Sequence, residues 1–419
     1  MKIISTSDWH LGNLFHGNDR LAEHKHFLSW LLQRIEEQQP DALLVAGDVF
    51  DNGNPSAAAQ SAYYEFLADA TRACPAMQVV ITAGNHDSAN RLEAPRALLS
   101  RHKVEIRGTV HREWVVTDDG GCWTVNYDDL IIPMQSSDGC QVVVLAVPYL
   151  RNDVVRGGSY SEGVNDFMRS LMARARELYP SHKQVMMAHM YAKGADIAHS
   201  DASEKIVIGG QEEVNMEGWD HHPDYLTCGH IHKRQHIWDT TWARYTGSIL
   251  PMSFAEKDYV HGVDLVTMTP GGKTINVDLL EYTPQHALCV LPEGDEELTP
   301  KKLAKLINES LDERVDGVLG DDFKYVVLKV KLDKVKNDEI KALEDLMGRK
   351  NAVLCKIQKV VGNIDLTTVV GNRHITSIDD IIDRDPLETL KETFVAEHKR
   401  EMNERQESLL KELLSSIND

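Results

Sequence analysis

The chain has few of the features that mark disulfide-rich, zinc-knuckle or membrane proteins. Its six cysteines lie far apart and none belongs to a Cys-x-x-Cys pair, which argues against a zinc knuckle and against a disulfide framework. Its longest apolar runs, such as residues 142–147, are far too short to cross a bilayer. A strand pattern begins at residue 2, so we expect no apolar leader segment. These features predict a cytoplasmic protein with reduced thiols and no membrane contact.

Positive charge is also scarce. The sequence holds 45 Lys and Arg against 65 Asp and Glu, which gives a formal net charge of −20. This balance argues against a protein that binds nucleic acid by overall charge alone. A polyanionic substrate would have to be held by local basic groups, by metal ions or by a partner subunit. The 419 residues, 42% of them hydrophobic, predict a soluble globular protein of two or three domains.

The region 1–282 predicts an α/β domain. Strand-like runs at residues 3–7, 42–46 and 78–83 alternate with helical patterns at residues 20–37 and 55–73. A further helix near residues 164–178 leads to a strand at 184–188, and residues 224–282 turn to strands with tight connections. Helices packed on a central pair of sheets would account for this mixture.

The pattern changes near residue 283. Residues 286–362 alternate strand, helix, strand, helix and strand, which predicts a small α+β domain. Its middle strand is rich in lysine, with Lys324, Lys329, Lys331, Lys334 and Lys336. A solvated strand edge is the favoured interpretation of these lysines, and contact with DNA is the alternative.

Residues 385–419 predict an amphipathic helical segment. Pro386 stands at its start, and leucines recur at helical spacing as far as Leu414. Such a segment either packs on its own domain or docks onto another chain. The sequence favours neither.

Five short motifs stand in order between Asp8 and His232, and each follows a stretch that predicts a strand. They are Asp8-Trp9-His10, Gly47-Asp48-Val49-Phe50-Asp51, Gly84-Asn85-His86-Asp87, a lone His189, and Gly229-His230-Ile231-His232. Ligands of α/β sheets gather at the carboxyl ends of the strands. Carboxylate, amide and imidazole groups gathered there predict a site for two divalent ions. The seven candidate ligands are Asp8, His10, Asp48, Asn85, His189, His230 and His232.

The ligands divide between two positions. Asp8 and His10 are two residues apart on a segment expected to be extended, so both side chains should point the same way. Asp48 has two carboxylate oxygens and is the natural bridge. Asp8, His10 and His232 are assigned to one ion, and Asn85, His189 and His230 to the other. Two such ions would polarise a phosphoryl oxygen and activate a water for in-line attack.

His86 follows a ligand but should point elsewhere if Asn85 faces the metals. We predict that it is the general acid, or the group that stabilises the leaving oxygen, with Asp87 holding its imidazole in one orientation. Asp51 is expected to tighten the turn after Asp48 or to support a ligand.

Other polar residues match no motif. Surface or structural roles are expected for His24, His26, His221 and His222. Lys193, Lys205, Lys233 and Arg234 flank the motifs, but a basic residue beside a loop is more often solvated than bound to phosphate.

The motifs resemble those of the calcineurin-like metallophosphoesterases, and more narrowly the SbcD-type subunits of the bacterial SbcCD double-strand break nuclease. The resemblance extends from the start of the chain to about position 280. The narrower match includes Asp8 to Gly12, Ala83 to Ser88 and the block Gly247-Ser248-Ile249-Leu250-Pro251-Met252-Ser253-Phe254. Serine/threonine phosphatases of the superfamily continue the second motif with arginine and end the third in Glu. Here Asn52 and Asp87 stand at those places, which disfavours that activity.

The resemblance implies a four-layer αββα metallophosphoesterase sandwich at residues 1–282, a capping domain at 283–365 and, at 366–419, a linker with a helical segment. It also implies two manganese ions and a hetero-oligomer with an SbcC-type ATPase subunit, which the helical segment binds. A homodimer of this chain is expected, and DNA is the substrate. ATP-dependent double-strand exonuclease and ATP-independent single-strand or hairpin endonuclease activities would serve DNA repair, recombination and replication.

Two other functions compete with a DNA nuclease. One is a phosphodiesterase that acts on a small nucleotide or a lipid head group. The other is a scaffold that has kept the fold, lost the chemistry and works by binding proteins. A scaffold of this kind usually lacks ligands, whereas none is missing here.

Overall fold

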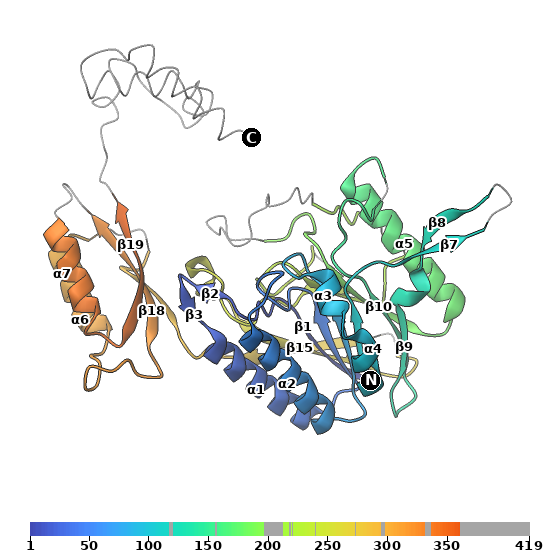
Figure 1. Cartoon of the computed structure of the whole chain (residues 1–419), viewed down its shortest axis with the longest axis horizontal. Helices are drawn as coiled ribbons and strands as arrows, with labels where there is room; N and C mark the ends of the chain where they lie inside the picture. Colours follow the sequence, from blue (N-terminus) through green and yellow to red (C-terminus); the bar gives the residue numbers. More distant parts are fainter. Residues whose placement is uncertain are drawn as a thin grey trace, which may run out of the picture. The chain divides into compact units, whose positions relative to one another are not determined.

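The fold is described from a computed structural model (Figure 1). The described residues are 1–116, 120–155, 157–196, 213–217, 219, 221–238, 240–272, 274–294, 298–331 and 337–360. The predicted helical segment at 385–419 and Lys205, Lys334 and Lys336 lie outside them. The chain divides into two compact units. The first holds residues 1–290, 314–326 and 351–356, and the second begins at Leu291.

The first unit contains two six-stranded sheets. In the first sheet, four strands are parallel neighbours: β1 (Lys2–Thr6), β4 (Ala42–Ala46), β5 (Gln78–Thr82) and β6 (Val104–Arg107). Antiparallel β15 (His261–Met268) and β16 (Ile275–Tyr282) extend it beyond β1. The second sheet has the order β13 (Gln235–His236), β14 (Ala243–Tyr245), β12 (Tyr225–Gly229), β11 (Lys183–His189), β10 (Gln141–Ala146), β9 (Ile131–Gln135). Its strands β10, β11, β12 and β14 are parallel.

Helices cover the outer faces of both sheets (Figure 1). They are α1 (Leu21–Gln38) and α2 (Ala57–Ala73) beside the first sheet and α5 (Tyr160–Leu178) beside the second. Shorter elements connect these layers: β2 (Leu14–Phe15), β3 (Asn18–Asp19), α3 (Ala89–Glu93), α4 (Arg96–Leu99), β7 (Arg112–Val115) and β8 (Cys122–Val125). The helices predicted at 20–37 and 55–73 are confirmed within two residues.

Alternate residues of each strand explain the layering. In β4, Leu43 and Val45 belong to a cluster with Phe27 of α1, whereas Leu44 faces the second sheet and shares a cluster with Val144 of β10. The second sheet does the same, because Val143 packs with residues of α5. Strands buried on both faces are continuously apolar, which is why these runs show no polar alternation. The four-layer αββα sandwich is therefore confirmed.

The predicted order of strand, helix, strand, helix and strand after residue 286 is also confirmed. The elements are β17 (Leu288–Leu291), α6 (Pro300–Ser310), β18 (Lys324–Lys331), α7 (Asn337–Met347) and β19 (Ala352–Val360). The strands form a sheet in the order β17-β18-β19. The lysine-rich strand β18 is thus central, so the interpretation of its lysines as a strand edge is wrong, although Lys331 is exposed. Lys329 donates a hydrogen bond to the Gly294 carbonyl (2.6 Å).

No helix among the described residues is long and apolar enough to cross a membrane. All six cysteines lie in the described part of the chain and are free thiols. Cys74, Cys140 and Cys228 are buried and Cys122 is exposed. The expectation of reduced, partly buried thiols is therefore consistent with the structure.

A buried ion pair anchors the start of α1. Arg20, 1% exposed, binds both carboxylate oxygens of Glu23 at 2.9 and 2.8 Å and donates a third hydrogen bond to the Pro251 carbonyl (2.6 Å). The Tyr325 hydroxyl donates to the same carboxylate (3.0 Å). Because both charges are out of water, each depends on its partner.

Replacing Arg20 by methionine is expected to lower the free energy of unfolding by about 3–5 kcal/mol, because the Glu23 charge would stay buried without the positive charge of Arg20. Urea denaturation measures the change, and Arg20→Met/Glu23→Gln should recover part of it. Arg72 makes a matched surface pair with Asp69 and is 77% exposed. Arg72→Met should therefore cost no more than about 1 kcal/mol. Equal losses in the two single variants would contradict this account.

Candidate metal centre

All seven candidate ligands lie at the carboxyl ends of five strands. Asp8 and His10 follow β1, Asp48 follows β4 and Asn85 follows β5 in the first sheet. His189 is the last residue of β11 in the second sheet, and His230 and His232 follow β12. The first sheet thus brings four candidates and the second sheet three. The structure brings all of them together, as their distances establish.

The ligand atoms form two overlapping groups around Asp48. In one group, ligand atoms of Asp8, His10 and His232 all lie within 4.8 Å of one another. Around the other position, His189 Nε2 lies 3.2 Å from Asp48 Oδ2 and 2.9 Å from Asn85 Oδ1. His230 Nδ1 reaches the same Asn85 oxygen at 3.1 Å. His10 Nε2 is 3.8 Å from Asp48 Oδ2. Asp48 therefore stands between the groups, as a bridging ligand must.

The backbone at four candidate ligands is left-handed. Asp8, His10, Asp48 and His230 have φ values of 50°, 44°, 48° and 97°. Such values are uncommon for residues other than glycine and cluster at functional sites. The prediction that Asp8 and His10 converge because they lie on an extended segment is wrong. β1 ends at Thr6, and the left-handed backbone at Asp8 and His10 replaces the expected extended segment.

Two features of the buried groups fit divalent cations. Both ring nitrogens of His10 are buried and make no hydrogen bond with the described residues, although buried polar atoms are normally paired. Burial alone would raise the pKa of Asp48, but the charge and hydrogen bond of His189 hold that pKa well below its ordinary value. The Asp48 charge in turn raises the pKa of His189, against the effect of burial. A bound cation would take the place of the proton on the His189 ring, and a cation beside His10 would satisfy one of that ring's unbonded nitrogens.

Asp87 does not hold the His86 ring, so that part of the prediction is wrong. Its buried carboxylate accepts hydrogen bonds from the backbone N–H groups of Gly84 (2.9 Å), Val49 (3.1 Å) and Phe50 (2.9 Å). Asp87 therefore ties the loop after β5 to the loop after β4. Burial and the neighbouring Asp48 charge raise the pKa of Asp87 to about 6.

Asp51, and not Asp87, orients the His86 ring. Its backbone carbonyl accepts a hydrogen bond from His86 Nδ1 (2.8 Å), and its carboxylate lies 3.6 Å from His10 Nδ1. The Asn13 amide donates to that carboxylate (2.8 Å). The His86 backbone N–H also donates to Asp48 Oδ1 (2.8 Å), while the His86 side chain is exposed. His86 is thus held at the open side of the site.

Sequence reasoning missed Glu256 and Ser7. Glu256, fully buried in the short helix η3 (Phe254–Glu256), accepts a hydrogen bond from His232 Nδ1 (3.1 Å). The Ser7 hydroxyl donates to Asp8 Oδ2 (2.5 Å). Ser7 precedes a motif residue, which is a weak signal, whereas Glu256 lies well beyond His232 in the sequence and belongs to no motif. A carboxylate on the outer nitrogen of a metal-binding histidine is a common support.

Two of the four basic residues that flank the motifs are paired with acids, Lys193 is exposed, and Lys205 lies outside the described residues. Lys233 forms an ion pair with Asp196, and Arg234 binds the buried Asp264 at 2.7 Å. His24 was expected at the surface or in a structural role, and it is fully buried near His10. Burial lowers its pKa to about 3, so it is a neutral core residue.

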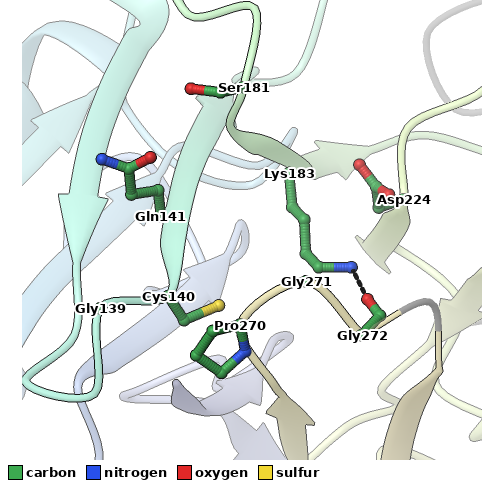
Figure 2. A pocket seen from close by; sticks show the side chains of 9 residues that line it. All are labelled: Gly139, Cys140, Gln141, Ser181, Lys183, Asp224, Pro270, Gly271 and Gly272. Carbon is green, nitrogen blue, oxygen red and sulfur yellow. Dashed lines mark hydrogen bonds between the residues drawn. The ribbon is translucent and has the colours of Figure 1, made fainter.

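Two other polar clusters lie apart from the candidate ligands. A pocket lined by Gln141, Lys183, Asp224 and Gly272 opens at the amino ends of β10, β11 and β12, the opposite edge of the sheet (Figure 2). There Lys183 Nζ donates to the Gly272 carbonyl (2.5 Å). The second cluster holds Glu93, His111 and Asp129. Arg96 binds both of its carboxylates, so its single positive charge offsets one of their two negative charges.

Comparisons with known proteins agree with the geometry. A model of the calcineurin-like phosphoesterase family matches residues 1–234. The SbcD subunit of the SbcCD nuclease of Rhodobacter capsulatus is 34% identical over 325 residues, which cover 75% of this chain and 77% of that protein. The corresponding nuclease subunit of Escherichia coli K12 is 31% identical over 310 residues, covering 70% of this chain and 71% of the relative.

A third relative extends the same similarity. The SbcD nuclease subunit of Bacillus subtilis strain 168 is 30% identical over 279 residues, covering 65% of this chain and 67% of that protein. The matched family uses divalent metals. The chain therefore belongs to the calcineurin-like phosphoesterase family and, within it, to the SbcD group of nuclease subunits.

Proposed function

We propose that this chain hydrolyses phosphodiester bonds of DNA at a two-manganese site, as the nuclease subunit of a complex with an SbcC-type ATPase. The observation that carries the proposal is the complete ligand set, gathered around Asp48 beside an exposed His86. Asp8, His10 and His232 would hold one ion, Asn85, His189 and His230 the other, and Asp48 both. Bound ions of this kind polarise a phosphoryl oxygen and acidify a water.

Two further side chains have separate roles, one in proton transfer and one in positioning the ligand loops. His86 donates a proton to the leaving oxygen. The Asp51 carbonyl accepts a hydrogen bond from His86 Nδ1 (2.8 Å) and so keeps the ring in one orientation. The buried Asp87 fixes the loops that carry Asp48 and Asn85. Positive charge from two cations would offset the substrate's charge locally, so the net charge of −20 does not prevent DNA binding.

The wider assignment follows from the family. We propose ATP-dependent double-strand exonuclease and single-strand or hairpin endonuclease activities in DNA repair, recombination and replication. We also propose a homodimer of this chain in the cytoplasm. The names of the relatives, which are nuclease subunits of SbcCD, support the activity and the partner.

The proposal is tested on a radiolabelled hairpin-ended duplex, with and without Mn²⁺ and with and without the ATPase subunit. We expect manganese-dependent opening of the hairpin by the chain and degradation of the duplex only with the ATPase and ATP. DNA left intact under every condition, together with rapid hydrolysis of a small diester, would instead identify a small-molecule phosphodiesterase.

Deletion of residues 385–419 is expected to spare manganese-dependent endonuclease activity and to abolish association with the ATPase subunit. The apolar residues of this segment recur at helical spacing, which suits docking onto another chain. Gel filtration of the mixed subunits measures the association. An intact complex without residues 385–419 would show that the segment is not needed to bind the ATPase subunit.

A further inference from the structure

The segment of residues 246–256 follows β14 and touches supports of two candidate ligands. At its start, Thr246 Oγ1 lies 2.6 Å from Ser7 Oγ, and the Ser7 hydroxyl donates to Asp8 Oδ2. At its end, Glu256 Oε1 accepts a hydrogen bond from His232 Nδ1. The segment includes the block at 247–254 that distinguishes the narrower resemblance, yet it contributes none of the seven ligands.

Both supported ligands belong to the same group. Asp8 and His232, with His10, have ligand atoms within 4.8 Å of one another; Asp8 also lies within that distance of Asp48 and His189, whereas His232 does not. The histidines of the other group are held by different partners, His189 Nδ1 by the Ala46 carbonyl (3.0 Å) and His230 Nδ1 by Asn85. The 246–256 segment therefore supports two ligands of the position that His232 shares with Asp8 and His10, and none of the histidines of the other position.

The segment is itself firmly held. Ser7, Thr246 and Glu256 are at most 2% exposed. The Met252 backbone N–H donates to Glu256 Oε2 (2.8 Å), and the Ser248 N–H donates to the His232 carbonyl (3.0 Å). Buried side chains fixed in this way hold a ligand in one rotamer, which preorganises a metal site.

We infer that the 246–256 segment sets the metal affinity of the position formed by Asp8, His10 and His232 and leaves the other position unaffected. Thr246 acts through Ser7, whose single proton is directed onto Asp8 when the Thr246 hydroxyl donates to Ser7. Glu256 holds the Nδ1–H tautomer of His232, in which Nε2 carries the lone pair that a cation needs. The inference rests on the proposed two-metal site. Thr246 and Glu256 are positioning residues in this scheme.

The test is titration of the metal-free, full-length protein with Mn²⁺, with free Mn²⁺ followed by electron paramagnetic resonance and heat by calorimetry. Thr246→Val removes the hydroxyl at nearly constant volume, and Glu256→Gln gives the buried site an amide in place of a carboxylate. Each is expected to weaken one of two binding steps about 10- to 100-fold and to leave the other unchanged. Thr246→Ser keeps the hydroxyl and should restore wild-type binding.

A matched control is a second pair of buried hydroxyls that, like Ser7 and Thr246, joins the two sheets. Thr227 Oγ1 and Ser5 Oγ are 2.5 Å apart and fully buried, and neither hydrogen-bonds a candidate ligand. Thr227→Val should therefore leave both binding steps unchanged. If Glu256→Gln fails to fold, Thr246→Val alone decides.

Four outcomes would overturn the inference. Wild-type protein that binds two Mn²⁺ ions while Thr246→Val binds both equally well would overturn it and leave the proposed function standing. Equal weakening of both steps, or the same loss in Thr227→Val, would show a general effect on the core and not support of one position. Wild-type protein that binds no divalent ion would remove the proposed function itself.

Discussion

Protein carrying His189→Ala is expected to lose metal-dependent DNA cleavage by about three orders of magnitude or more while remaining folded. His189 Nε2 lies 3.2 Å from Asp48 and 2.9 Å from Asn85, so its loss opens the position these groups share. Metal catalysis of this kind supplies several kcal/mol, and each 1.36 kcal/mol is about tenfold in rate. Cleavage of the hairpin duplex and metal content by mass spectrometry measure the change.

Two comparisons make the His189 result specific. His189→Asn places its amide nitrogen near the position of Nδ1, where it can donate to the Ala46 carbonyl, and leaves no group at the Nε2 position, so it separates loss of the ligand from loss of this core hydrogen bond. His221→Ala removes an exposed histidine that matches no motif and should behave as wild type. Circular dichroism checks that each variant is folded. Full activity in His189→Ala with both metals bound would mean that His189 is not a ligand.

The local structure around the site was largely predictable. Strands with both faces buried are apolar throughout, so runs such as residues 42–46 stand out, and the motif residues directly follow them. The carboxyl ends of parallel strands meet at one edge, which placed Asp48 and Asn85 near each other. The proximity of Asp48 and Asn85 thus followed from local patterns, whereas the meeting of the first sheet's ligands with the three histidines of the second sheet did not.

Contacts between distant segments could not be predicted in the same way. The central place of β18 depends on which strands pair, and pairing leaves no periodic signal in one strand. Glu256 contacts His232 although the two residues are far apart in the sequence, and neither residue type predicts this contact. The left-handed backbone at Asp8 and His10 is similarly set by the surrounding loops. Asp87 looked like a partner for its neighbour His86, whereas burial turned it toward backbone amides.

His86→Ala is expected to retain both metal ions and to lose about 10²- to 10⁴-fold in DNA cleavage, the usual contribution of a general acid. The His86 ring is exposed, and its centroid lies 4.8 Å from that of the His10 ring. A hydrogen bond from His86 Nδ1 to the Asp51 carbonyl fixes its orientation. Ligand atoms of His86, His10 and Asp48 also lie within 4.8 Å of one another, so a metal-ligand role is the specific alternative.

The leaving group distinguishes these roles. A deoxyribose oxygen leaves poorly unless it is protonated, whereas p-nitrophenolate is a stable anion that needs no proton. If His86 is the acid, the alanine variant should cleave DNA far more slowly than wild type but hydrolyse bis(p-nitrophenyl) phosphate nearly as fast, with both metals present. Equal losses on the two substrates with metal retained would assign His86 to stabilising charge on the phosphoryl group. Loss of one metal ion would make His86 a ligand, because a proton donor at the open side of the site has no reason to hold a cation.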